Sequence, residues 1–262
     1  MNKKILIVIV IIAIMLAGCI PKQDNAFKEV DIEKNGEDVK ENINEKLGEQ
    51  EQLKVLKDYY ELIENNISED QIINNIKNNI TKLDEVKADE MLIQLENYLY
   101  SKAYDAKKVI EKLAPFVENA SDEFNSYFKI WETETENETT DGEGLKISAE
   151  EIIDRALDIE RHTNKFPENK LKQKLEDLYK AYISLSLKGL GNPYIFAKEG
   201  ENTLNPDMLE MYKQKIDENP DSRTAKILDN YLGELEKDSY NLNGDNVNYF
   251  YENIDQIINN TK

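Results

Sequence analysis

The chain contains a single histidine, His162, so any catalytic or metal-binding scheme that needs an imidazole must use it. Its neighbours Glu160, Arg161 and Thr163 are all polar, which favours a solvent-exposed helix face. A serine hydrolase of the common elbow type also needs a Gly-x-Ser-x-Gly motif, and the sequence has none. A histidine-based zinc site needs more than one imidazole. We therefore predict no catalytic residue and no metal ligand.

Two other kinds of chemistry leave equally weak signals. The Gly-x-Gly segments 142–144 and 189–191 do not continue to a further Gly or Gly-Lys, and no strand precedes them, so neither is a phosphate loop. A glycosidase needs two suitably placed carboxylates. The 53 acidic residues contain many pairs, but their spacing singles out none. We predict a protein that is not an enzyme and uses no cofactor, and an envelope hydrolase with paired carboxylates is our third hypothesis.

An aromatic stretch lies inside the longest irregular region of the chain, residues 189–206. Its members are Asn192, Pro193, Tyr194, Ile195 and Phe196. Long irregular segments in compact domains are often functional, and aromatic side chains are enriched in protein interfaces. We predict an interaction loop at this stretch. The alternative is that the loop folds back and buries these side chains as part of the core.

The chain begins with an apolar N-terminal run. Lys3 and Lys4 precede Ile5–Ala17, which contains no polar residue, as in a secretory signal peptide. A membrane-spanning helix needs about 20 apolar residues, so this run is short for a permanent span. It closes with Leu16-Ala17-Gly18-Cys19, which resembles the lipobox of bacterial lipoproteins.

That resemblance covers roughly the first twenty residues and implies three processing events. The Cys19 thiol receives a diacylglycerol, a lipoprotein signal peptidase cleaves between Gly18 and Cys19, and the new amino terminus is acylated. Two or more acyl chains anchor a protein stably, whereas one does so only marginally. We therefore expect a protein attached by lipid to the extracytoplasmic face of a bacterial cell membrane. The alternative is an ordinary N-terminal membrane anchor with an incidental cysteine.

Composition limits the partners and the covalent chemistry of the exported part. Cys19 is the only cysteine, so disulfides are excluded and the fold must rely on a packed core. The formal net charge is −20, which repels nucleic acid and anionic lipid headgroups. We predict no nucleic-acid partner. Contact with the membrane is expected only through the lipid on Cys19.

Apolar residues recur at spacings of three and four along most of the chain, the pattern of amphipathic helices. No run alternates at a period of two for long enough to indicate a strand. We predict an all-α fold, either a multi-helix bundle or a helical-hairpin array, after an N-terminal signal helix and a disordered tether. The expected helices cover 45–67, 68–83, 88–117, 121–131, 148–166, 167–188, 206–218, 224–238 and 247–258.

Segment 132–146 marks the clearest internal break, because it is rich in acidic residues and follows the expected core residue Trp131. It lacks the residue order of an EF-hand calcium loop, so we interpret it as a linker. The predicted organisation is a signal peptide at 1–18, a lipidated cysteine and flexible tether at 19–44, an N-terminal helical bundle at 45–131, the acidic linker at 132–146 and a C-terminal helical bundle at 147–262.

These observations favour a non-enzymatic interaction or binding module at the cell envelope, with an envelope protein as its expected partner. The alternative is a solute- or peptide-binding lipoprotein that serves a transporter. Such lipoproteins are commonly α/β proteins with a cleft between two lobes, and this sequence has no strand pattern.

Overall fold

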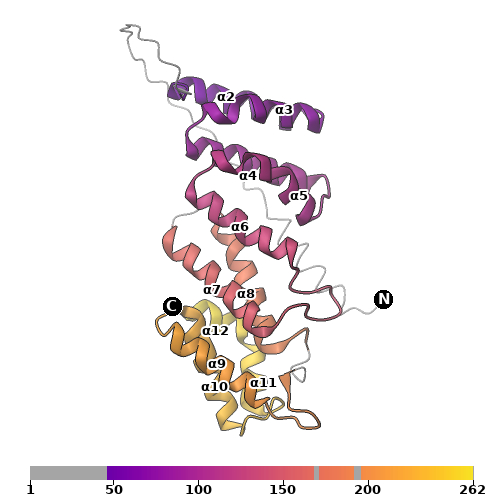
Figure 1. Ribbon diagram of the computed structural model, residues 1–262, viewed down its shortest axis with the longest axis vertical. Coiled ribbons are helices and arrows are strands. Elements are labelled where there is room, and N and C mark those ends of the chain that lie inside the picture. Colours follow the sequence, from indigo (N-terminus) through magenta and orange to yellow (C-terminus); the bar gives the residue numbers. More distant parts are fainter. Residues whose placement is uncertain (1–45, 168–170, 192–195, 262) are drawn as a thin grey trace. The chain divides into compact units, whose positions relative to one another are not determined.

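The computed structural model describes residues 46–167, 171–191 and 196–261 (Figure 1). Within these ranges the chain forms α-helices α2 to α12, two short 3₁₀ segments and no strand, which confirms the all-α prediction. Isolated bridges, such as Ala197 with Leu204, are the nearest approach to a sheet. None of the helices in the described ranges has the length and apolar character required to cross a bilayer. The predicted signal peptide, lipobox and tether lie outside the described residues.

The chain divides into two compact units, which are treated separately here. The N-terminal unit ends at Asn125 and the C-terminal unit begins at Ser126, so the boundary falls inside helix α6 (Asp122–Glu136). We had expected the break at the acidic segment 132–146. The first part of that segment is instead the last turn of α6, and the part that follows is held by hydrogen bonds to the side chain of Arg155.

The N-terminal unit consists of short helices joined by tight turns. They are α2 (Glu49–Glu64), α3 (Glu69–Asn79), the 3₁₀ segment η1 (Ile80–Lys82), α4 (Glu85–Ser101), α5 (Ala106–Leu113) and the 3₁₀ segment η2 (Ala114–Asn119). Their apolar stripes meet in a core that includes Tyr59, Ile72, Ile76, Leu83, Met91, Leu95 and Leu99, each fully buried.

The long helix expected over 88–117 is broken. Helix α4 ends at Ser101, and Ala103 takes the left-handed backbone conformation with φ +60°. Asp105 then caps α5 by accepting a hydrogen bond from the backbone N–H of Lys108 at 2.8 Å. The left-handed residue costs free energy for any side chain with a Cβ, and the cap helps to offset that cost. Helix α5 ends at Leu113, just before Pro115.

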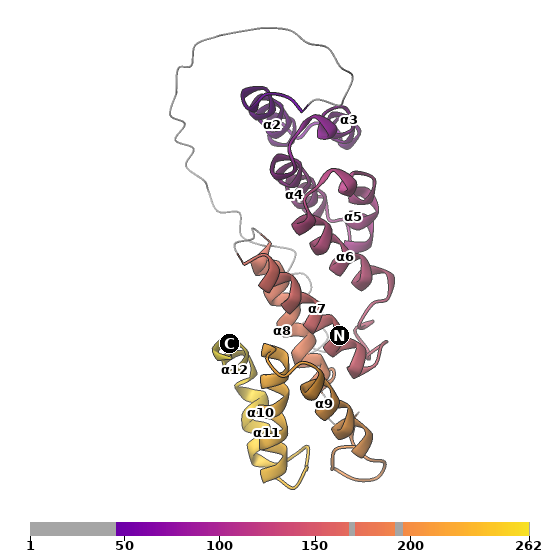
Figure 2. The ribbon, with the colours of Figure 1, turned by 60° about the vertical axis from the view of Figure 1, so that its left-hand side comes forward.

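Helices also make up the C-terminal unit beyond α6. They are α7 (Ala149–Lys165), α8 (Lys172–Lys188), α9 (Pro206–Glu218), α10 (Arg223–Lys237), α11 (Asp245–Glu252) and α12 (Ile254–Asn260). Helices α7 and α8 pack along each other, as do α9 with α10 and α10 with α11 (Figure 2). The helix predicted over 247–258 is two helices, separated at Asn253.

Tyrosines fill much of the C-terminal core. Tyr179, Tyr182, Tyr212 and Tyr231 are almost completely inaccessible, and each buried hydroxyl has a hydrogen-bond partner. A buried phenol needs such a partner because an unpaired polar group in the core is costly. The rings of Tyr212 and Tyr231 meet edge to face at 5.9 Å.

One polar cluster fixes α10 against α7 and α8. The Glu160 carboxylate of α7 accepts hydrogen bonds from the backbone N–H groups of Arg223 and Thr224, at 2.6 and 3.0 Å. The Arg223 guanidinium forms a two-point ion pair with Glu176 of α8 and lies 4.6 Å from the centre of the Tyr179 ring. The Glu160 side chain of another helix therefore satisfies two backbone N–H groups of the first turn of α10, and Glu176 holds the side chain of Arg223.

Candidate functional site

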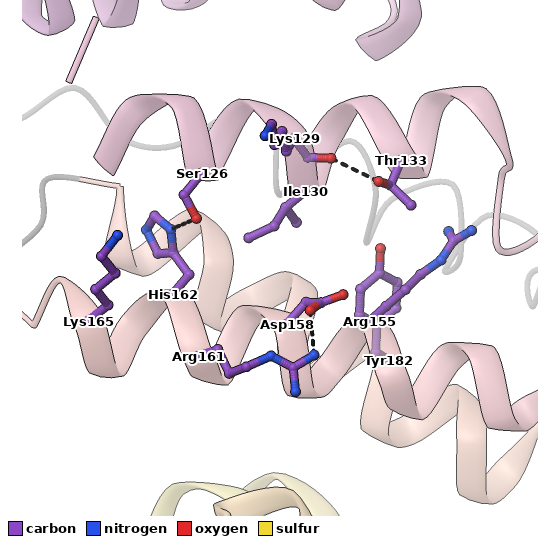
Figure 3. A pocket seen from close by; sticks show the side chains of 10 residues that line it. All are labelled: Ser126, Lys129, Ile130, Thr133, Arg155, Asp158, Arg161, His162, Lys165 and Tyr182. Carbon is purple, nitrogen blue, oxygen red and sulfur yellow. Dashed lines mark hydrogen bonds and ion pairs between the residues drawn. The ribbon is translucent and has the colours of Figure 1, made fainter. Parts of the chain in front are cut away.

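A cavity of about 350 Å³ opens between α6, α7 and α8, entirely within the C-terminal unit. Figure 3 shows side chains of α6 facing those of α7, with one tyrosine of α8 behind them. We call it the basic cavity because four of its side chains carry a positive charge and one a negative charge. It is lined by Ser126, Lys129, Ile130, Thr133, Arg155, Asp158, Arg161, His162, Lys165 and Tyr182.

His162 is the most enclosed polar group of the cavity that still lacks a complete set of partners. It is only 3% exposed, so the expectation of a solvent-exposed helix face was wrong. Its Nδ1 lies 2.9 Å from the Ser126 hydroxyl of α6, and its ring stacks at an angle on Phe166. Its Nε2 is buried without a hydrogen-bond partner in the part of the chain that the structure describes.

The electrostatic surroundings of His162 favour the neutral imidazole. Burial lowers its pKa below the ordinary value of 6.5, and the positive charge of Lys165 lowers it further. In either neutral tautomer Nδ1 pairs with Ser126, because the serine hydroxyl can donate or accept. Nε2 is therefore the atom left for a ligand. Figure 3 shows this second ring nitrogen on the side of the ring where Lys165 ends.

Two cations at the cavity have no carboxylate partner among the described residues. Lys129 is exposed and Lys165 lies over the Phe166 ring, with Nζ 4.8 Å from its centre. Arg161 differs, because it forms an exposed ion pair with Asp158 one turn earlier on α7. The uncompensated charge at the cavity therefore comes from the two lysines.

A hydrogen-bonded network around Arg155 and Tyr182 forms one wall of the cavity, and the Arg155 Nε is its buried atom without a partner among the described residues. The Arg155 guanidinium donates to Glu134 at 2.8 Å and to Glu151 at 2.7 Å, and it also reaches the hydroxyl of Thr139. The Tyr182 hydroxyl donates to Glu134 at 2.7 Å. Burial, followed by the nearby Glu134 charge, raises the pKa of Tyr182 well above its ordinary value. The two terminal nitrogens of Arg155 and the Tyr182 hydroxyl are thus already engaged with protein groups.

The Ser126–His162 pair does not form a catalytic triad. In a triad the base is held by a third group at the ring nitrogen that does not face the nucleophile. Here that nitrogen, Nε2, has no partner among the described residues, and the neighbouring Asp158 binds Arg161 instead. The arrangement provides hydrogen-bond donors and positive charge, which suit binding of an anion.

The residues predicted from the sequence as functional lie elsewhere. Gly18, Cys19 and residues 192–195 are outside the described ranges, so their assignment stays a prediction. Phe196 is described and is 6% exposed, with its backbone carbonyl accepting from the N–H of Asn205. Its aromatic ring is therefore part of the core. For the described residues, no cluster of three or more His, Cys, Asp or Glu side chains is arranged to hold a metal ion.

Sequence reasoning did not identify the basic cavity. Its two uncompensated lysines come from different helices and are separated by 36 positions of sequence, as are Ser126 and His162. The available signal was the presence of a lone histidine on the apolar side of α7, four residues before Phe166. The polar neighbours of His162 concealed that signal.

Comparison with protein-family models, with curated proteins and with solved structures finds no significant match to this chain.

Proposed function

We propose that the protein is a non-enzymatic binding module attached by lipid on Cys19 to the extracytoplasmic face of a bacterial cell membrane, and that the basic cavity is its binding site. The lipobox-like sequence Leu16–Cys19 supports the attachment. The observation that carries the binding role is the cavity itself, with a buried, unpartnered His162 nitrogen and two lysines without carboxylate partners.

The size and chemistry of the cavity support binding over catalysis. Ligand sites in proteins commonly have volumes of about 300–1,000 Å³, and the cavity lies at the lower end of that range. A buried polar atom without a partner costs about 1–3 kcal/mol, so a ligand that satisfies it gains affinity. The transporter-lipoprotein alternative receives no support from the fold, since its usual α/β architecture is absent from the described residues.

The test is retention of an envelope component by the full chain. The chain would be immobilised in detergent and mixed with solubilised envelope of its own organism. It would be compared with the double variant Lys129→Gln/Lys165→Gln and with the control double variant Lys172→Gln/Lys213→Gln. The control lysines are exposed residues of the same unit that do not line the cavity, so both variants lose the same charge.

We expect the wild-type chain and the control variant to retain the same component and the cavity variant to lose it. Equal retention by all three would place the binding site elsewhere. Retention of no component by any of them would contradict the binding function. Turnover of an envelope substrate by the wild-type chain would contradict its non-enzymatic character.

A further inference from the structure

We infer that the basic cavity binds the phosphate monoester group of a small ligand, with phosphate oxygens accepting from the Nε2–H of His162 and from the ammonium groups of Lys129 and Lys165. This inference rests on the proposed binding function and names its ligand class. The three donors come from two helices of one unit.

The imidazole contributes the buried contact. In the tautomer that the inference requires, the Ser126 hydroxyl donates to Nδ1, 2.9 Å away, and the ring proton lies on Nε2. That N–H is enclosed and has no acceptor within the described ranges. An anionic oxygen would satisfy it, and charge-assisted hydrogen bonds are about twice as strong as neutral ones. A cation would meet a donor and two like charges there.

The number of donors favours a phosphate monoester over a carboxylate. Arg155 and Arg161 are paired with three carboxylates, those of Glu134, Glu151 and Asp158, and the two lysines with none, so these seven groups together carry a net charge of about +1. A phosphate monoester offers three acceptor oxygens, one for the Nε2–H of His162 and one for each lysine. A carboxylate has only two oxygens for the same three donors. The remaining volume of the cavity then holds the organic part of the ligand.

The strongly acidic composition of the chain does not oppose this assignment. Exposed charges are screened over about 8 Å at physiological ionic strength, so a ligand in the cavity responds mainly to the groups that line it. The acidic groups nearest to the cavity, Glu134, Glu151 and Asp158, are already paired with arginines. The net charge of −20 would slow the approach of an anion more than it would weaken its binding.

The single histidine permits a direct test by NMR. The full chain, purified in detergent without a histidine tag and labelled on histidine with ¹⁵N, gives ring-nitrogen signals from His162 alone. Glycerol phosphate is the probe and acetate is the carboxylate control. We expect saturable shifts of the Nε2 signal with glycerol phosphate, a higher pKa of His162 in the saturated protein, and weaker or no shifts with acetate.

Two double variants distinguish binding at the cavity from a general effect of the protein's net charge. Lys129→Gln/Lys165→Gln is expected to weaken glycerol phosphate binding by at least about tenfold, because two charge-assisted contacts to the phosphate are lost. Lys172→Gln/Lys213→Gln should leave it unchanged. Equal weakening in the two double variants would overturn the site. Equal affinity for acetate and glycerol phosphate would overturn the ligand class.

The same chemistry is present on a free metabolite and on a lipid headgroup, and a second arm distinguishes them. His162 signals would be compared for the chain in phosphatidylcholine nanodiscs with and without phosphatidic acid. A response to phosphatidic acid alone supports the inference with a lipid as the source, and a response to glycerol phosphate supports it with a soluble one. No response to either overturns it.

Failure of this inference is distinguishable from failure of the binding function. One outcome is that Lys129→Gln/Lys165→Gln no longer retains the envelope component, while neither phosphate probe shifts the His162 ring signals. The cavity then binds a ligand of another class. If no envelope component is retained and no phosphate probe shifts the His162 signals, both proposals are wrong.

Discussion

Oε2 of Glu134 lies 2.8 Å from Nη1 of Arg155 and also accepts from the Tyr182 hydroxyl, so one carboxylate oxygen joins α6 to α7 and to α8. The Arg155 side chain is 6% exposed and that of Glu134 is 20% exposed. A pair this enclosed stabilises the fold mainly because removing one partner leaves the other buried without compensation. The pair also connects the acidic segment to helix α7 within the C-terminal unit.

Arg155→Ala is therefore expected to reduce the free energy of unfolding by about 3 kcal/mol. Arg161→Ala is the matched control on the same helix, because its pair with Asp158 is exposed and contributes about 0–1 kcal/mol. Urea unfolding followed by the fluorescence of Trp131, the only tryptophan, measures both. Equal losses in the two variants would show that the buried network has no special role.

His162 predicts a pH dependence of stability with a definite sign. Its pKa in the folded protein is below the ordinary value, because burial and the charge of Lys165 both disfavour the protonated ring. The unfolded chain therefore binds more protons between the folded pKa and about 6.5. The stability due to the neutral ring is complete above pH 6.5 and is lost as pH falls toward the folded pKa.

The measurement is a comparison of wild type and His162→Gln by unfolding at several pH values between 7 and the onset of acid denaturation, roughly pH 5. The other charged groups that line the cavity are Arg155, Asp158, Arg161 and Lys165 on α7 and Lys129 on α6, and all of them are present in both proteins. We expect the wild type to lose more stability on acidification than the variant. Parallel pH profiles would contradict the lowered pKa.

Two glycines of the C-terminal unit give opposite predictions for the same substitution. A Cβ on Gly244 would lie 2.2 Å from the side chain of Asp238, which accepts hydrogen bonds from Asn246 and from the backbone N–H of Val247. Gly244→Ala must displace that carboxylate and is expected to cost about 1–3 kcal/mol. Gly233 is exposed within α10 and has open space around its Cβ position.

Gly233→Ala is expected to stabilise the protein by about 0.5–1 kcal/mol, because alanine restricts the unfolded chain and favours the helix. Thermal unfolding of the two variants beside the wild type measures the difference. A lower melting temperature for Gly233→Ala, or an unchanged one for Gly244→Ala, would contradict the packing around these residues.

The lipid attachment predicts the fate of a Cys19→Ala variant. Without the thiol no diacylglycerol can be added, so the variant should incorporate no labelled fatty acid and should leave the detergent-rich phase in a phase-partition assay. Expression of wild type and variant in a bacterium with labelled palmitate measures both properties. A variant that still partitions with detergent would favour the alternative, in which Ile5–Ala17 is a permanent anchor.

Much of the fold could be predicted because helical periodicity is a local property. The stripes in the sequence lie on the buried faces of most helices, and α9 begins at Pro206, where the helix over 206–218 was expected. The break after α4 was missed because it depends on the left-handed backbone of Ala103, a residue that otherwise favours helix. Neither glycine nor proline marks that position.

The site could not be predicted because its contacts join distant parts of the chain. His162 is buried and forms a hydrogen bond with Ser126 of another helix, although its sequence neighbours are polar. The segment 132–146 resembled a linker because it contains no basic residue before Lys146, and its partner Arg155 lies on α7. Local patterns reveal charge and periodicity, whereas pairing between helices depends on the fold.

The cap on α10 has a consequence for how the C-terminal unit is assembled. The first turn of α10 depends on Glu160, which lies more than 60 residues earlier, and on Glu176 through Arg223. A fragment that begins at α9 would lack both carboxylates, and its α10 would fray at the N-terminus. Because α7 and α8 precede α10 in the chain, both carboxylates are synthesised before the helix that they hold. The residues that hold the first turn of α10 therefore come before α10 in the chain.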